Sequence, residues 1–126
     1  MPLVRIDLRR GKPPAYRKAI ADGVYRALRE TFNVPDEDRF LIVTEHDGSD
    51  FIYSPNYLGI ERSEDLVIVQ ITANATRTLE QKKMFYARVA ALLSENPGVR
   101  PQDVFINLVE VAKENWSFGN GIAQYA

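Results

Sequence analysis

The sequence contains two related halves, and this duplication limits the folds that are open to the chain. At an offset of 65 residues, the separation of Asp38 from Asp103, residues 34–45 align with residues 99–110 and share Val, Asp, Phe and Glu at equivalent positions. Repeats at a fixed spacing indicate that one structural unit is used more than once. We therefore predict one domain, residues 1–126, built from two copies of a unit at about residues 2–46 and 66–111.

Each copy is predicted to fold as a strand, a helix and a second strand. The first strand alternates apolar and polar residues, whereas its counterpart at 66–72 is nearly continuously apolar and suits a central, buried position. Apolar residues recur at three- and four-residue steps in the two predicted helices, and Thr78 with Gln81 forms the second helix's capping box. The predicted strands are residues 2–8, 39–45, 66–72 and 104–111, and the predicted helices are residues 14–32 and residues 78 to about 96.

Two such units predict an α+β fold. A β-α-β crossover makes its two strands parallel, so two units side by side give a four-stranded mixed sheet with both helices on one face. The other face then lacks a cover within one chain, and because layers pack in pairs we expect oligomerisation through it. The tail, residues 116–125, is aromatic with two turn glycines and is predicted to form a hairpin or a strand added to a neighbour.

Composition excludes several classes of function. Sixteen basic and seventeen acidic residues leave a formal charge of −1, and no block of like charge suggests a nucleic-acid or membrane-surface partner. The absence of a long apolar run or a charged-then-apolar leader predicts a cytoplasmic protein. There is no cysteine and a single histidine, His46, which we interpret as a strand-end residue without chemistry. We expect neither a metal nor a cofactor.

The dipeptide Met1-Pro2 carries the first chemical signal. Methionine before a small residue such as proline is normally removed, which leaves proline with a free secondary amine. An α-amino group titrates near pH 8, and burial or a nearby cation lowers that pKa towards neutrality. Such an amine can transfer protons or form an iminium with a carbonyl, whereas the nitrogen of a chain that retains Met1 is an amide and can do neither.

These features together resemble the tautomerase superfamily, and most closely its malonate semialdehyde decarboxylase-like branch. The resemblance covers essentially the whole chain. It rests on the duplicated unit and on four motifs: Pro2-Leu3-Val4-Arg5-Ile6-Asp7, Val34-Pro35-x-x-Asp38-Arg39, Arg77-Thr78-x-Glu80-Gln81-Lys82 and Trp116-Ser117-Phe118-Gly119. It implies the tautomerase fold, a homotrimer and no cofactor.

The resemblance also implies roles for individual residues. Pro2 matches the general acid or base, Asp38 the aspartate that orients water or substrate, and Arg77 the arginine that binds the substrate carboxylate. A guanidinium forks onto a carboxylate, and the adjoining helix N-terminus favours anions, so the last assignment also makes independent sense. The aromatic wall over the site corresponds to Trp116, Phe118 and Tyr125.

Simpler interpretations stand beside these roles. Asp38 has a twin, Asp103, so both could cap turns, and the three aromatic residues could pack in a trimer interface. Many members of the branch carry Arg-x-Arg before the second helix, whereas this chain reads Asn74-Ala75-Thr76-Arg77, so carboxylate binding is predicted to rest on Arg77 with Asn74. Arg39 and Tyr53 are expected near the same loops as supporting residues.

Three functions follow from this interpretation. The leading one is cofactor-free decarboxylation of a small 3-oxo acid, malonate semialdehyde to acetaldehyde, with hydration of related acids as a side activity. The second is keto–enol tautomerisation of an arylpyruvate or dienol acid with neutral Pro2 as base. The third is a symmetric trimer that acts as a binding module without turnover. The expected enzyme partner is a small carboxylate, and neither nucleic acid nor membrane is expected.

Overall fold

The computed structural model describes residues 2–126, and Met1, whose removal is predicted above, lies outside the described residues. Four strands and two long helices follow one another as two β-α-β units. Their bounds are β1 (Leu3–Arg9), α1 (Pro14–Phe32), β2 (Leu41–His46), β3 (Val67–Asn74), α2 (Leu79–Glu95) and β4 (Val104–Val111). Short 3₁₀ turns lie between and after these elements, at Gly48–Asp50, Tyr57–Gly59, Pro101–Asp103 and Lys113–Asn115.

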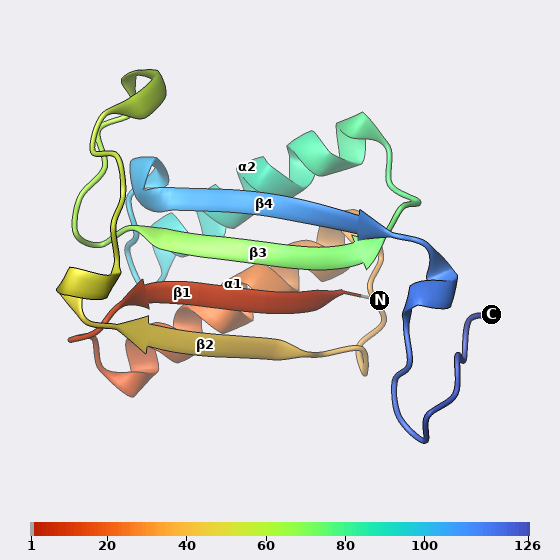
Figure 1. The fold of residues 1–126 in the computed structure, drawn as a ribbon. Coiled ribbons are helices and arrows are strands. Elements are labelled where there is room, and N and C mark those ends of the chain that lie inside the picture. Colours follow the sequence, from red (N-terminus) through yellow and green to blue (C-terminus); the bar gives the residue numbers. More distant parts are fainter. Residues whose placement is uncertain (1) are drawn as a thin grey trace.

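The four strands form one mixed sheet in the order β2-β1-β3-β4. Within each unit the strands are parallel, as a crossover requires, and the two units meet through the antiparallel pair β1 and β3. Both helices cover the same face of the sheet (Figure 1). The predicted four-stranded mixed sheet with two helices on one face is therefore confirmed.

The core lies between this sheet face and the helices. Alternate residues of the two central strands are buried, and each helix adds one apolar stripe, with Ile20, Val24 and Leu28 on α1 and Phe85, Val89 and Leu93 on α2. The helices approach closely at Gly23, where a Cβ atom would lie 2.8 Å from Cδ2 of Leu93. This contact is the reason that α1 has a glycine in its middle.

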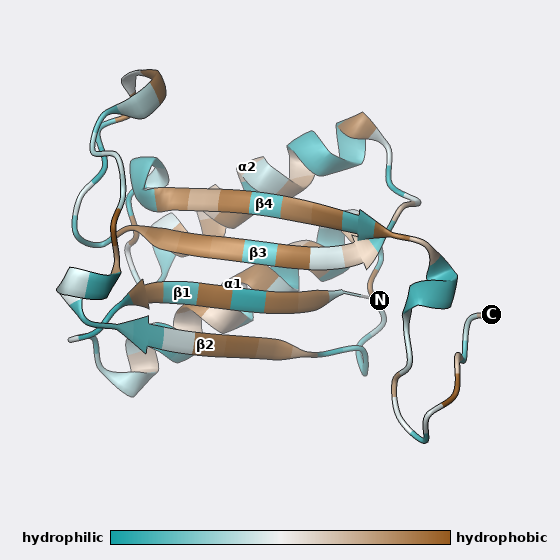
Figure 2. Cartoon of the chain, in the orientation of Figure 1, coloured by the Kyte–Doolittle hydropathy of each residue, from teal (hydrophilic) through white to brown (hydrophobic). Residues whose placement is uncertain are grey.

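The opposite face of the sheet is uncovered in the described chain. It carries exposed apolar side chains on both edge strands and directly before β2: Phe40 is 51% exposed, Ile42 42%, Phe105 47% and Val109 38%. Figure 2 shows hydrophobic residues along all four strands, interrupted by polar positions near the middle of β1, β3 and β4. Two of these polar residues bond to each other, since Gln70 Nε2 donates to Asn107 Oδ1 at 3.0 Å. No helix within residues 2–126 is long and apolar enough to cross a membrane.

Residues 116–126 form no strand in this chain, and the prediction that the tail adds a strand to a neighbour concerns a partner chain and stays a prediction. Gly119, Asn120 and Gly121 all have positive φ angles, of 143°, 60° and 68°, and such residues turn the chain instead of extending it. The tail folds back on itself beside the end of the sheet where β1 starts (Figure 1). The amide of Gln124 closes the fold-back, because it accepts from the Phe118 N–H and donates to the Gly119 carbonyl, both at 2.9 Å.

Candidate active site

One end of the sheet collects most of the predicted site residues. At this end β1 and β2 start, whereas β3 and β4 finish, since β1 pairs parallel to β2 and antiparallel to β3. Leu3 lies opposite Thr72, and the N–H of Val4 donates to the carbonyl of Phe40 at 3.0 Å. The segment before β2, the segment after β3 and the tail after β4 therefore surround the start of β1. We call this end of the sheet the Pro2 end.

Pro2 is buried directly before β1. Because Leu3 pairs with Thr72 and Val4 with Leu41, the residue ahead of them lies beside the end of β3 and the turn that precedes β2. An amine at this position would sit in partly desolvated surroundings, which lower an amine pKa.

Asp38 comes to the Pro2 end on a tight turn. Its N–H donates to the carbonyl of Pro35 at 3.1 Å, and the hydroxyl of Tyr25 donates to the carbonyls of Pro35 and Asp36 at 2.9 and 2.6 Å. Helix α1 thus fixes the turn through one buried tyrosine. Burial raises the pKa of the Asp38 carboxyl above its ordinary value, and the positive charge of Arg77 opposes this rise.

Arg77 lies between β3 and α2 and is anchored by the far end of α1. Its Nη2 donates to the carbonyl of Phe32 at 3.0 Å, and the guanidinium carbon lies 5.0 Å from the centre of the Phe32 ring. Its Nη1 donates to the hydroxyl of Thr76 at 3.3 Å. A guanidinium has five N–H donors, so these bonds leave donors for a carboxylate ligand.

This anchor explains how a cation can precede a helix. Arg77 stands just before the N-terminus of α2, where the helix dipole disfavours a positive charge. The same guanidinium meets the C-terminal carbonyls of α1, which favour one. Burial lowers the pKa of Arg77, and the negative charge of Asp38 and the hydroxyl of Tyr125 oppose that fall, which places all three groups within electrostatic reach of one another.

Asn74, the last residue of β3, links the sheet to the tail. It is only 7% exposed, and its Oδ1 accepts a hydrogen bond of 2.8 Å from the indole N–H of Trp116. The bond ties the start of the tail to the strand end that neighbours Pro2. The side-chain oxygen of Asn74 thus holds the tail, and its amide NH₂ is the part that remains to meet a substrate.

The three predicted aromatic residues of the tail pack against one another. The Trp116 and Phe118 rings stack with centroids 5.4 Å apart, and Tyr125 meets Phe118 edge-on at 5.0 Å. Both geometries are favourable for aromatic pairs. The cluster forms an apolar wall next to a cation and a carboxylate, and such a wall strengthens the interactions of charged groups by excluding water.

The structure thus brings together Pro2, Asp38, Arg77, Asn74 and the aromatic cluster, but not every expected residue. Arg39 pairs with Asp22 at 2.6 Å and lies over the ring of Tyr25, the tyrosine that holds the Asp38 turn. Tyr53 lies on the segment that follows β2, at the opposite end of the sheet (Figure 1). Within one chain the direction of β2 places Tyr53 the length of that strand away from the Pro2 end, whereas Arg39 precedes β2 and lies at the Pro2 end.

His46 also lies at that opposite end. Its Nε2 is 2.6 Å from Oδ1 of Asp7, and its ring stacks on Phe51. The strand-end position predicted for this histidine is confirmed. Within residues 2–126, no group of three or more His, Cys, Asp or Glu residues is arranged to hold a metal ion.

Two contributors to the site were missed by sequence reasoning. The carbonyl of Phe32 anchors Arg77, and the amide of Gln124 closes the tail. A backbone carbonyl leaves no signature in a sequence. The Gly119-Asn120-Gly121 run is a turn signal, and it could have prompted a search for a polar residue that closes the turn.

Comparison with known proteins gives a consistent result. Two family profiles, both described as tautomerase enzyme, match residues 2–60 and 38–119. A probable tautomerase, YusQ of Bacillus subtilis (strain 168), is 39% identical over 124 residues, which is 98% of each chain. A second probable tautomerase of that organism, YrdN, is 35% identical over 99% of this chain and 96% of its own.

Solved structures match over the same extent. FG41 malonate semialdehyde decarboxylase inhibited by 3-bromopropiolate is 44% identical, with a TM-score of 0.91 over 98% of this chain and 93% of its own. Another malonate semialdehyde decarboxylase, described with decarboxylase and hydratase activities, is 32% identical, with a TM-score of 0.91 over 98% and 95% of the two chains. A fused 4-OT symmetric trimer shares the fold at 22% identity, with a TM-score of 0.79 over 95% and 94%.

Proposed function

The chain belongs to the tautomerase family, and from this premise we propose that it is a cofactor-free enzyme in which the Pro2 amine acts on a small 3-oxo carboxylic acid. The leading reaction is the decarboxylation of malonate semialdehyde to acetaldehyde. The proposal is supported by the position of Pro2 directly before β1, at the end of the sheet where Asp38 and Arg77 lie within electrostatic reach of each other beside an aromatic cluster. The 44% identity to a malonate semialdehyde decarboxylase supports the choice of substrate.

Arg77 binds the substrate carboxylate in this mechanism. The bond to the Phe32 carbonyl fixes one side of the guanidinium, so that the remaining N–H donors present a preset direction to the ligand. A carboxylate held in this way can keep its bond to C2 out of the plane of the 3-carbonyl group. In that orientation the electrons of the breaking C–C bond overlap with the carbonyl π system.

Pro2 provides the electron sink. As a protonated amine it donates to the 3-carbonyl oxygen, the C1–C2 bond breaks, CO₂ leaves, and the electron pair forms the enol. Proton transfer to C2 then gives acetaldehyde, so the net change is uptake of one proton and release of CO₂. A preorganised charge in a site that excludes water is the largest contribution to such a step, and removal of one such group costs about 2.7–4 kcal/mol.

Asp38 and the tail complete the proposed site. The Asp38 carboxyl orients the substrate, or a water molecule in the hydration of related unsaturated acids, next to the Pro2 nitrogen. The cluster of Trp116, Phe118 and Tyr125 covers the site and keeps bulk water from the developing charge. Asn74 holds that cover in place through Trp116 and presents its amide to the substrate.

Keto–enol tautomerisation is the second candidate function. The observation that favours it is the 39% identity to a probable tautomerase over 98% of both chains. In this reaction Pro2 acts as a neutral base on an arylpyruvate or a dienol acid. The two reactions therefore require opposite protonation states of one amine, which makes them distinguishable by pH.

The test begins with intact mass, to establish that Met1 is removed. NMR then follows the formation of acetaldehyde from malonate semialdehyde by the wild type and by the variants Pro2→Ala and Arg77→Ala. We expect each variant to lose about 10²–10³ in kcat/KM, as for the loss of one stabilising group. Wild-type turnover in both variants would show that the site is assigned wrongly.

The pH profile separates the candidates in the same assay. Release of acetaldehyde should fall as the pH rises through the pKa of the Pro2 amine, because decarboxylation needs the protonated amine. Enolisation of phenylpyruvate should rise over the same pH range if the enzyme is a tautomerase, because that reaction needs the neutral amine. The control is Lys18→Ala, since Lys18 is an exposed cation near the start of α1 that pairs with Asp22, far along the helix from Phe32. This variant should match the wild type in both assays.

We also propose that the enzyme is a homotrimer assembled through the uncovered sheet face. The exposed apolar residues of that face, Phe40, Ile42, Phe105 and Val109, need a cover that the described chain does not supply. The fused 4-OT relative of the same fold is described as a symmetric trimer. A cytoplasmic location is proposed from the sequence expectations above.

A further inference from the structure

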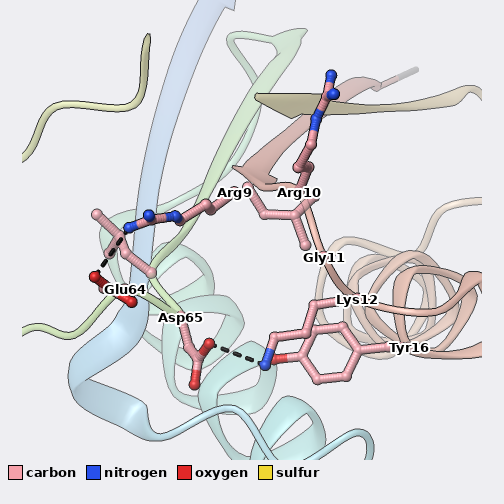
Figure 3. A pocket seen from close by; sticks show the side chains of 9 residues that line it. Arg9, Arg10, Gly11, Lys12, Tyr16, Glu64 and Asp65 are labelled. Atoms are coloured by element: carbon pink, nitrogen blue, oxygen red, sulfur yellow. Dashed lines mark ion pairs between the residues drawn. The ribbon is translucent and has the colours of Figure 1, made fainter. Parts of the chain in front are cut away.

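A second pocket lies at the end of the sheet opposite Pro2. It has a volume of about 220 Å³ and is formed where β1 ends, α1 begins and β3 begins. Figure 3 shows the side chains of Lys12 and Tyr16 on one side of this pocket, with Asp65 facing Lys12 and with Arg9 reaching Glu64. We call it the Lys12 pocket.

The internal duplication makes the Lys12 pocket the counterpart of the Pro2 end. At the offset of the repeat, Lys12 corresponds to Arg77, and each lies two residues before its helix, α1 starting at Pro14 and α2 at Leu79. Asp103 corresponds in the same way to Asp38. The pocket thus repeats the cation of the proposed active site, whereas Asp103 does not line it and is held by Ser63 and Arg100.

The counterpart of Pro2 is Val67, which lies inside the chain at the start of β3. An internal residue has no amine, so proton transfer of the kind proposed for Pro2 has no equivalent in the Lys12 pocket. The recognition of an anion by a cation at a strand-to-helix junction does not need that amine. The chemistry is lost at this end of the sheet, but the means of binding a carboxylate is present.

A carboxylate of this chain already contacts the cation. Asp65 Oδ1 lies 3.0 Å from Lys12 Nζ, and this bond raises the pKa of Lys12. Lys12 also lies 5.0 Å from the centre of the Tyr16 ring, and burial raises the pKa of that tyrosine, which keeps its hydroxyl protonated as a donor. Asp65 therefore occupies the place on Lys12 that a ligand carboxylate would take.

Asp65 is a weak competitor for that place. Its side chain is 53% exposed, and Glu64, which pairs with Arg9 at 3.0 Å, is 73% exposed. Exposed ion pairs contribute little to stability, so a ligand can displace them at low cost. A ligand with two carboxylates replaces both, one on Lys12 and one on Arg9, whereas Arg10 extends away from the pocket (Figure 3).

We propose that the Lys12 pocket is a second, non-catalytic binding site for small dicarboxylates, in which Asp65 competes with the ligand for Lys12. The proposal does not depend on the reaction at Pro2. The ligand class of the Lys12 pocket overlaps with that of the proposed substrate. A small carboxylate could therefore bind at both ends of the sheet, at Lys12 as well as at the Pro2 end.

The experiment titrates malonate, which has two carboxylates and no carbonyl to react. An Arg77→Ala background removes the first carboxylate site, and ¹H–¹⁵N NMR follows the amides of Gly11, Lys12 and Tyr16. We expect saturable shifts at these amides. Asp65→Asn should tighten binding about fivefold, which corresponds to about 1 kcal/mol, the upper range for an exposed pair. Lys12→Gln should abolish the saturable shifts.

The matched control is Asp36→Asn, which removes the same charge from another exposed ion pair, with Arg29 at 2.9 Å. It should leave the affinity unchanged. If Asp36→Asn and Asp65→Asn increased the affinity for malonate equally, the change in net charge alone would explain the tighter binding, and the proposal would be overturned. Absence of saturable shifts, or unchanged binding in Lys12→Gln, would overturn it as well, and thermal melts of each variant exclude unfolding as the cause.

Discussion

The hydrogen bond between Trp116 and Asn74 offers a direct test of how the tail is held over the site. Trp116→Phe removes only the indole N–H and the outer part of the ring, and it keeps an aromatic side chain to stack on Phe118. Asn74 is 7% exposed, so the variant leaves its Oδ1 without this donor in a buried position. A buried polar group without a partner costs about 1–3 kcal/mol.

This cost falls on the docking of the tail and not on the fold as a whole. The tail follows β4 and adds no strand to the sheet, so the chain can release it without opening the core. We expect the population of the docked tail to fall about 5- to 150-fold relative to the undocked form, as that free energy implies. We expect kcat/KM to fall by the same factor if the docked tail is needed for turnover.

A double-mutant cycle isolates the bond from the rest of the ring. Asn74→Ala removes the acceptor, and in that background Trp116→Phe should cost about 0.5–1.5 kcal/mol less than it does alone. Two quantities are measured. One is kcat/KM, and the other is the rate of hydrogen exchange of the Phe118 amide, which donates to Gln124 within the folded-back tail. The second does not require the proposed substrate. Additive effects on exchange would refute the idea that this bond holds the tail.

Two further predictions concern stability and assembly. Burial raises the pKa of Asp38, so ionisation of this carboxyl lowers the free energy of unfolding at neutral pH. Asp38→Asn should therefore have a higher melting temperature than the wild type at pH 7, and this difference should disappear as the pH falls towards 3.8. Burial also acts on Asp103, but bonds from Ser63 and Arg100 outweigh it and lower that pKa, so Asp103→Asn should lose roughly 1.5–3 kcal/mol at pH 7 and less as the pH falls through the folded-state pKa. Melts of both variants between pH 3 and 8 check the opposite signs, and equal signs would contradict the assignment.

Phe105→Arg on the uncovered sheet face should convert the proposed trimer to monomers, as measured by light scattering. Met84→Arg, on an exposed part of α2, should leave the trimer intact. A wild-type protein that is monomeric would contradict the proposal.

The two aspartates show what the sequence could and could not distinguish. They occupy equivalent positions of the repeat, and sequence alone leaves a turn-capping role open for both. In the structure Asp103 is fully buried, accepts from the N–H and hydroxyl of Ser63 at 2.7 and 2.6 Å, and pairs with Arg100. The lowered pKa of Asp103 follows from these partners, of which Arg100 lies three residues away and Ser63 comes from a distant part of the chain that leaves no local pattern.

The fold was more accessible than the site for a physical reason. Periodicity and the repeat report which residues face a core, and these patterns predicted the strands, both helices and the mixed sheet. The anchoring of Arg77 by the Phe32 carbonyl depends on how the end of α1 meets the start of α2. The path of the tail depends on three successive positive φ angles and on the amide of Gln124, which its aromatic composition does not report.

The two ends of the sheet differ in a way that duplication itself imposes. Each copy supplies a strand start, an aspartate before its second strand and a cation before its helix, but a chain has only one amino terminus. Only the first copy can offer a proline amine, so position 67 is free to become valine and to join the core, where it is fully buried. Joining two copies in one chain therefore keeps two anion-recognising ends and reduces the amine chemistry to one. At the Lys12 pocket, which has no amine, Asp65 precedes the second copy and pairs with the cation that corresponds to Arg77.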